Sequence, residues 1–360
     1  MPKLTALSKK HKQAILFIVT ATLIWGAAGP VIKYTLNFIP PFTFLFLRFL
    51  VASCIVLPFL LLEQDKHHVD KKDLPNLIIL SFLGGTLTLV FTFLGFKYTS
   101  ALDGSLISSV SSVFVLWASH KFLGEKITKN QRKGVIIATL GTLLVVLHPF
   151  LEGILNSTGC SHSLMESRGI SNLIGNLLMI LSILAWTLYT LWSKKVLDHI
   201  PSKMGFLFHA FHLRTTMRKY SPFFLTGVLC VVSLITLAPM AFIEVASIKG
   251  VNLPGMEQVG QSIRETYQLP TFESEYVIPL AGVFFMGIFS TLVAYGMYEW
   301  ALKDMPVAES AIYSYLSPLF GIPVGYILLG EVPGLWYILG GIVIAFGVYI
   351  SEKQPAKEPC

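Results

Sequence analysis

Residues 101–141 read ALDGSLISSVSSVFVLWASHKFLGEKITKNQRKGVIIATLG, and residues 307–347 repeat this pattern without a gap, 206 positions later. The copies align their Leu-Gly-Glu turns, at 123–125 and 329–331, and their paired glycines, at 134 and 141 and at 340 and 347. Each copy is an apolar segment that opens with an acid, then a short turn, then a second apolar segment. Because an internal repeat constrains the architecture of the whole chain, we predict one structural unit present twice.

Basic charge differs sharply between the two copies. The first turn carries five basic residues and the second carries none; the five are Lys121, Lys126, Lys129, Arg132 and Lys133. Since basic loops stay on the cytoplasmic side of a membrane, the two copies are predicted to face opposite sides. Such inverted repeats are typical of transporters.

The composition excludes an ordinary soluble domain. The 360 residues are 54% hydrophobic and 13% charged, with a mean hydropathy of +0.68, whereas soluble domains carry about 25% charged residues. Apolar runs of roughly 18 or more residues, long enough to cross ~30 Å of hydrocarbon, recur along the chain. The net charge of +7 does not indicate nucleic-acid binding, because the basic residues lie in short loops between apolar runs.

The apolar runs predict ten membrane-spanning helices, near residues 13–36, 42–62, 75–96, 101–121, 133–149, 171–193, 221–243, 277–300, 306–329 and 334–351. With the N-terminus inside, 21 of the 27 Lys and Arg fall on the inner side and five on the outer side. The positive-inside rule therefore places both termini in the cytoplasm. The predicted fold class is an all-α integral membrane protein with ten transmembrane helices in two inverted five-helix repeats.

Three parts follow along the chain, a first repeat, an outer linker and a second repeat, at residues 13–149, 150–170 and 171–352. The first helices of the repeats also correspond, at an offset of 161, which aligns Trp25 with Trp186 and Lys33 with Lys194. The second repeat contains an inserted basic and aromatic segment, 203–222, which fits an amphipathic helix on the membrane or an irregular start of the next span. A long outer loop, 244–276, fits either a lid or a spacer.

These features resemble the EamA family of the drug/metabolite transporter superfamily. The matching pieces are Trp25-Gly26, Arg48-Phe49-Leu50, Ser317-Pro318, Leu329-Gly330-Glu331 and Gly340-Gly341. The resemblance covers residues 13–352 and implies two inverted five-helix repeats around a central cavity that moves small organic solutes without a nucleotide cofactor. The chain departs from the family pattern at Ser112, where a counterpart of Pro318 is expected, and in the inserted segment.

Charged residues inside apolar spans need an explanation, because a charge in hydrocarbon costs several kcal/mol. Arg48 either anchors a substrate carboxylate or phosphate or is structural, snorkelling outward or paired with Asp103 or a helix end. Asp103 and Glu309 are repeat-equivalent acids near helix N-termini, where the helix dipole alone stabilises a carboxylate; alternatively, one binds a cationic solute or a coupling proton. Glu299 is either a gate or cavity acid or a charge at the membrane interface.

Hydroxyl groups share one face of the fourth predicted span, where the serines are spaced three or four apart, at Ser105, Ser108, Ser109 and Ser112. A hydroxyl stripe gains nothing against lipid, so it lines either a tight helix contact or a polar cavity. In the ninth span, Tyr313 and Ser317 follow Glu309 at the same spacing.

Three aromatic residues, Trp25, Trp186 and Tyr189, lie inside spans rather than at the membrane interfaces where such rings are common. They either pack in the core or form the wall of a solute cavity. The repeated glycine pairs predict close helix contact rather than chemistry.

The sequence therefore predicts a secondary active transporter that exports small organic metabolites, such as amino acids, by alternating access in a plasma membrane of the bacterial inner-membrane type. Its partners are a small-molecule substrate and the lipid bilayer, and a coupling proton and a homodimer are left open. No nucleotide-binding loop, hydrolase elbow or metal-binding His pair is found, so no cofactor, metal, nucleic acid or enzymatic activity is predicted. The alternatives are a non-transporting scaffold or sensor and an integral-membrane enzyme acting on lipid-linked substrates.

Overall fold

The structure, a computed structural model, consists of helices. It describes residues 9–63, 70–99, 101, 104, 107–108, 110–155, 162–198, 220–251, 261, 267, 277–330, 332 and 335–352. No β-strand occurs among these residues. The predicted class, an all-α membrane protein, is confirmed.

Seven helical segments within the described ranges are long and apolar enough to cross a membrane. They are α1 (Lys9–Thr35), α2 (Pro41–Glu63), α3 (Leu74–Ser81) continued by η1 (Phe82–Leu87) and α4 (Thr88–Tyr98), α8 (His162–Asp198), α10 (Pro222–Ile248), α12 (Val277–Phe284) continued by η4 (Phe285–Val293) and α13 (Ala294–Asp304), and α14 (Val307–Tyr313) continued by η5 (Ser314–Leu316) and α15 (Ser317–Leu329).

The remaining helices are α6 (Ser111–Ala118) continued by η2 (Ser119–Leu123), α7 (Lys129–Leu155) and α16 (Leu335–Glu352). The predicted spans at 133–149 and 334–351 coincide with α7 and α16, and the span predicted at 101–121 is described only in part. The count of ten spans therefore stays a prediction.

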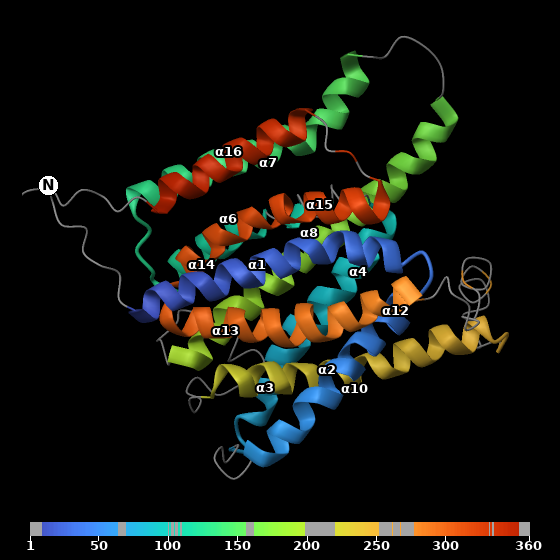
Figure 1. Ribbon diagram of the computed structural model, residues 1–360, viewed down its shortest axis with the longest axis vertical. Helices are drawn as coiled ribbons and strands as arrows, with labels where there is room; N and C mark the ends of the chain where they lie inside the picture. The colour runs from blue at the N-terminus through green and yellow to red at the C-terminus, as the bar shows by residue number, and fades with distance from the viewer. Residues whose placement is uncertain are drawn as a thin grey trace, which may run out of the picture.

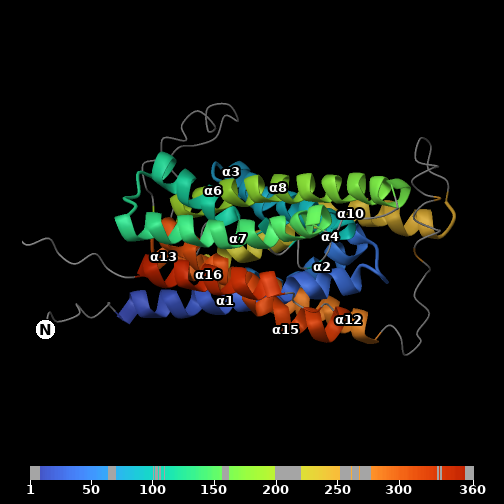
Figure 2. The same ribbon diagram turned by 90° about the horizontal axis from the view of Figure 1, so that it is seen from above.

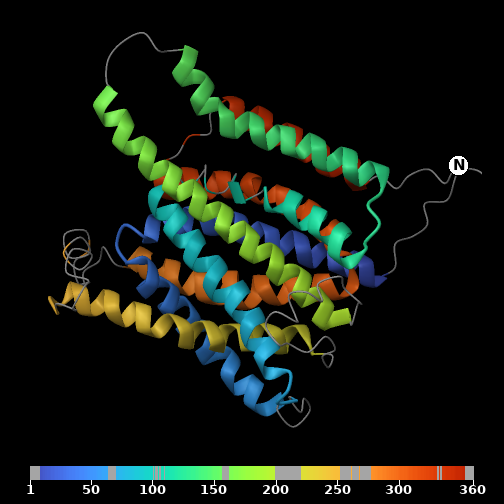
Figure 3. The same ribbon diagram turned by 180° about the vertical axis from the view of Figure 1, so that it is seen from behind.

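The interior is bounded by helices from both ends of the chain. α1 packs along α15 and α13, and α8 packs along α4 and α6. Figure 2 shows these groups as two layers, with α1, α13 and α15 in one and α8, α4 and α6 in the other. α2 pairs with α10 on one side of the bundle, and α7 pairs with α16 on the opposite side (Figures 1 and 3).

The contact between α7 and α16 depends on the repeated glycines. A Cβ atom added to Gly347 would lie 2.6 Å from the carbonyl oxygen of Gly134, and one added to Gly141 would lie 2.9 Å from that of Gly340. Glycine is therefore required for the close approach, as predicted. The early glycine of each helix meets the late glycine of the other, so the helices run antiparallel. This reciprocal contact is the one that a twofold axis produces, here between two repeat-equivalent helices.

A second pair of equivalent contacts involves two buried or half-buried lysines. Lys33 donates its Nζ hydrogens to carbonyl oxygens at the end of α4, including that of Thr99 at 2.7 Å. Lys194 does the same at the end of α13, including Met305 at 3.0 Å. Helix C-termini expose unpaired carbonyl groups and favour cations. The correspondence between Lys33 and Lys194 predicted from the sequence thus coincides with a shared role in helix capping.

Both Leu-Gly-Glu turns end a helix with glycine in the left-handed region. Gly124 has φ 72° and Gly330 has φ 66°, the conformation that commonly ends helices and that favours glycine. The next residue of the first turn, Glu125, accepts hydrogen bonds from the backbone N–H groups of Val307 (2.9 Å) and Ala308 (2.8 Å), the first two residues of α14. The turn of one predicted repeat therefore caps a helix of the other.

The inserted segment 203–222 lies outside the described residues except for its last three, and most of the outer loop does so too. Within the loop, Tyr267 is buried and donates its hydroxyl hydrogen to the carbonyl oxygen of Leu36 at 3.1 Å. Burial raises the pKa of Tyr267 to about 12. This part of the loop is fixed just beyond the end of α1, while its roles as lid or spacer stay predictions.

Candidate functional site

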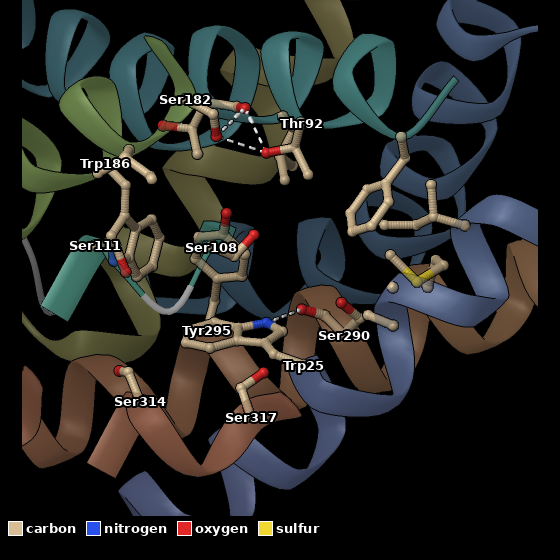
Figure 4. Close-up of a pocket in the computed structure, with 18 of the residues that line it drawn as sticks. Trp25, Thr92, Ser108, Ser111, Ser182, Trp186, Ser290, Tyr295, Ser314 and Ser317 are labelled. Atoms are coloured by element: carbon tan, nitrogen blue, oxygen red, sulfur yellow. Dashed lines mark hydrogen bonds between the residues drawn. The ribbon is translucent and has the colours of Figure 1, made fainter. Parts of the chain in front are cut away.

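A cavity of about 170 Å³ lies between the two helix layers (Figure 4). An apolar protein cavity of about 150 Å³ can hold a benzene molecule, so the cavity matches a compact organic solute. Its lining is rich in hydroxyl groups, supplied by Thr22, Thr88, Thr92, Ser108, Ser111, Ser182, Ser290, Ser314 and Ser317. The other polar or aromatic lining residues are Trp25, Arg48, Phe96, Trp186 and Tyr295.

One side of the cavity is an aromatic wall formed by Trp25, Trp186 and Tyr295, from α1, α8 and α13. The Trp25 ring lies 5.4 Å from that of Trp186 and 5.4 Å from that of Tyr295, both in edge-to-face contact. The Trp25 Nε1–H donates to the carbonyl oxygen of Ser290 at 3.1 Å, which fixes the ring (Figure 4). The two tryptophans predicted as core or cavity residues both line the cavity; solute binding by them stays a prediction.

Hydroxyl groups on the opposite side are partly committed to each other. The hydroxyls of Thr92 and Ser182 share a hydrogen bond of 2.6 Å, and Ser182 also donates to the carbonyl oxygen of Thr88 at 3.0 Å (Figure 4). On α1, the buried Thr22 hydroxyl has no hydrogen-bond partner among the described residues. Since a hydroxyl has one donor and two acceptor positions, this lining retains hydrogen-bonding capacity for a polar solute.

Arg48 is the charged residue of the described lining, and it is only 1% exposed. Its Nε–H donates to the Thr291 hydroxyl at 2.9 Å, and the guanidinium lies 5.4 and 5.8 Å from the ring centres of Phe49 and Phe93. Its Nη2 has no hydrogen-bond partner, and no acidic side chain of the described residues pairs with it. This burial argues against snorkelling. Asp103, one predicted partner, lies outside the described residues, and pairing with a helix end stays a prediction.

Burying a cation without an anion costs free energy, because no opposite charge offsets the lost hydration. A planar guanidinium stays charged and presents paired donors that match a carboxylate or phosphate. The geometry of Arg48 is therefore suited to binding an anionic group in the cavity.

Glu299 on α13 is fully buried, with 0% exposure, and does not line the cavity. Its Oε1 accepts a hydrogen bond from the hydroxyl of Tyr189, and its Oε2 accepts one from that of Ser193 at 2.5 Å. Protein therefore surrounds the carboxyl completely, and both predicted alternatives, a gate or cavity acid and a charge at the membrane interface, stay predictions. Tyr189 does not line the cavity either, and its ring lies 5.3 Å from that of Trp186 in the aromatic wall.

Of the remaining predicted site residues that the structure describes, Glu309, Ser112 and Tyr313 do not line the cavity. Glu309 lies in the first turn of α14, and its carboxylate is 2.9 Å from Nε2 of His11. Ser112 and Tyr313 are buried, 1% and 6% exposed, without lining the cavity. Of the predicted serine stripe, Ser108 does line it. Asp103, Ser105 and Ser109 lie outside the described residues.

Several lining residues were not singled out from the sequence, namely Thr22, Thr88, Thr92, Ser111, Ser182, Ser290, Tyr295 and Ser314. One signal was available, since Thr88 and Thr92, and Ser314 and Ser317, are spaced four and three apart in apolar segments. Tyr295 and Ser290 had no such signal, because their position depends on how α13 and η4 pack against α1.

Ligands for a metal are not grouped in the described part of the chain. No three His, Cys, Asp or Glu side chains lie close enough there to hold an ion. The cavity lining, with hydroxyls, rings and one guanidinium, is suited to an organic solute instead.

Comparisons with known proteins identify a family and similar proteins that are named as transporters. The sequence profile of the EamA-like transporter family matches residues 12–147 and 208–352. An "Uncharacterized transporter" of Archaeoglobus fulgidus is 28% identical over 350 residues, covering 96% of this chain and 98% of that protein. "Uncharacterized transporter YetK" of Bacillus subtilis is 24% identical, covering 98% and 92%. A solved crystal structure shares the fold, with a TM-score of 0.60 at 15% identity, covering 94% of this chain and 97% of that one.

Proposed function

Because the chain belongs to the EamA-like transporter family, we propose that it is a secondary active transporter that exports small organic solutes by alternating access around the cavity. The family and the named relatives give the coarser conclusion, a multi-pass membrane transporter. The proposal adds a substrate class, amino acids and related small carboxylates, a direction and a mechanism.

The observation that carries the substrate class is the unpaired guanidinium of Arg48 beside an aromatic wall. A carboxylate would bind Arg48, because a charge-assisted hydrogen bond offsets part of the free energy lost when the guanidinium is buried. The apolar part of the solute would pack on Trp25, Trp186 and Tyr295, and ring faces also attract an ammonium group. Free hydroxyl positions such as that of Thr22 would bind the remaining polar atoms.

We propose the repeats 13–149 and 171–352, and the reciprocal glycine contacts of α7 and α16 support a twofold relation between them. Rocking of the two repeat-related layers about the cavity would expose it to each side of the membrane in turn. The two hydrogen bonds that Glu125 accepts from the start of α14 would hold one side closed. The charge distribution supports cytoplasmic termini in a bacterial-type inner membrane.

The direct test is counterflow of solutes in proteoliposomes containing the full-length protein. Labelled amino acids, sugars and cationic drugs are offered in turn to the wild type, to Arg48→Gln, and to Lys121→Gln, a matched loss of an exposed positive charge away from the cavity. The expected result is uptake of at least one carboxylate-bearing solute, lowered about tenfold or more by Arg48→Gln and unchanged by Lys121→Gln. Absence of flux for every solute would contradict the proposal and favour a scaffold, a sensor or an enzyme.

A further inference from the structure

Glu299 stands out among the buried ionisable groups, because nothing in the transport scheme above uses it. It lies on α13, five residues before the end of that helix at Asp304, or about 7.5 Å along the axis. Within the described residues no cation pairs with it, since the ion pair found there joins His11 and Glu309. A buried carboxylate inside a membrane-spanning segment costs free energy, so its presence suggests a function.

The two hydroxyl partners allow Glu299 to hold or to release a proton in place. When the carboxyl is ionised, both oxygens accept, one from Tyr189 and one from Ser193, as the structure shows. When it is protonated, the new O–H can donate to either hydroxyl oxygen, because each hydroxyl is both donor and acceptor. The bound proton comes from water and returns to water, so no other reactant is needed.

Aromatic contacts connect this carboxyl to the cavity. Tyr189, which donates to Glu299, packs against Trp186 and Tyr295 of the aromatic wall, with ring centres 5.3 and 6.2 Å apart. Tyr298, the residue before Glu299, packs against Trp25 and Trp186 at 5.3 and 5.1 Å. A solute that displaces the wall would therefore move the side chains that hydrogen-bond to or flank Glu299.

Among the described residues, the ionisable neighbours of Glu299 include three tyrosines, Tyr189 from α8 and Tyr295 and Tyr298 from α13 itself. Tyrosine ordinarily ionises at about pH 10 and glutamate at about pH 4.3, so Glu299 is the member of this cluster that releases its proton first as pH rises.

Two charged groups on the elements packed around α13 have described partners of their own. Lys194 of α8 donates to carbonyl oxygens at the end of α13. Glu309 of α14 contacts His11 of α1. Cys230 of α10 is a buried free cysteine, and η4 contains no ionisable side chain.

We propose that Glu299, held by Tyr189 and Ser193, is a proton-binding site that couples proton movement to solute movement through the aromatic wall. This inference rests on the proposed transport function. The carboxyl would bind a proton in one orientation of the layers and release it in the other, so that the proton gradient drives the solute.

The test uses the full-length protein in proteoliposomes, a mixture of proteinogenic amino acids as the probe, and a pH difference of one unit imposed in each direction. One proton per solute supports about tenfold accumulation at one pH unit. The wild type is expected to reach about tenfold accumulation for one sign of the gradient. Glu299→Gln is expected to equilibrate the solute without accumulation while still exchanging labelled for unlabelled solute. Asp304→Asn, which removes an exposed acid from the same helix, should behave as wild type.

The outcomes separate the inference from the proposed function. The inference would be overturned if solute movement by the wild type did not depend on the pH difference, or if accumulation persisted in Glu299→Gln. Either result would leave the proposed transport function standing. No solute movement by the wild type would overturn both. If Glu299→Gln does not fold, Tyr189→Phe keeps the acid and removes one donor. It should move the pH at which gradient-driven transport is half-maximal, and an unmoved profile would count against the site.

Discussion

Replacing Gly347 by alanine should loosen the α7–α16 pair, and the structure gives the size of the effect. The added Cβ would lie 2.6 Å from the carbonyl oxygen of Gly134, 2.7 Å from the backbone nitrogen of Ala138 and 3.0 Å from its Cβ. Two of these neighbours are backbone atoms, so no rotamer change relieves the contact and the helices must separate. Overpacking of this kind typically costs about 1–3 kcal/mol.

Alanine also stabilises a helix relative to glycine, by about 0.5–1 kcal/mol, so the comparison needs a control with the same gain. Gly296 on α13 supplies it, because a Cβ there meets nothing within 4 Å. We expect Gly347→Ala to be less stable than Gly296→Ala by about 1–3 kcal/mol, measured by reversible unfolding in mixed micelles. Gly134→Ala should resemble Gly347→Ala, and the double variant should lose less than the sum, because both changes act on one contact.

Equal stability of Gly347→Ala and Gly296→Ala would refute this reasoning. A Gly134→Ala variant as stable as the control would refute the reciprocal contact. It would also refute the twofold relation between the two helices.

Three further predictions follow from other contacts. Arg48→Lys should weaken binding of a carboxylate solute about tenfold, measured by counterflow, because lysine lacks the planar fork; unchanged binding would argue against Arg48 as the anion site. Glu125→Gln should destabilise the start of α14 by about 1 kcal/mol, seen as faster amide exchange at Val307, and unchanged exchange would contradict the cap. Burial and the hydrogen bond to Asp73 raise the pKa of Tyr220 from 10.0 to about 12, so its contribution to stability is complete below pH 10 and is lost as pH rises through about 12. Tyr220→Phe should reduce the loss of stability at alkaline pH, measured by thermal unfolding. An unchanged loss of stability would mean that other groups cause it.

Composition and repetition made the all-α membrane class and one close helix contact predictable. The glycine pairs predicted close helix contact because a missing side chain matters only where backbones meet, and α7 and α16 meet there. The match of Trp25 with Trp186 placed two rings at equivalent depths, and in the structure they touch.

The site was predictable only where a residue was unusual for its span. Arg48 stood out because a charge is rare in hydrocarbon, whereas hydroxyls such as Ser182 are common in apolar helices and reveal their role only through packing. Glu299 showed why burial cannot be derived from position along a span: it lies near a helix end, yet it is fully buried and accepts two hydrogen bonds from α8.

Access to the cavity from both sides of the membrane is the most direct test of the account. The four native cysteines are replaced, a single cysteine is introduced at the lining residue Ser314, and a membrane-impermeant thiol reagent is added to one side of sealed vesicles at a time. A cysteine at the buried, non-lining Ala301 is the control. Alternating access predicts labelling of Ser314→Cys from either side and none of Ala301→Cys. Labelling from one side alone, or from neither, would contradict it.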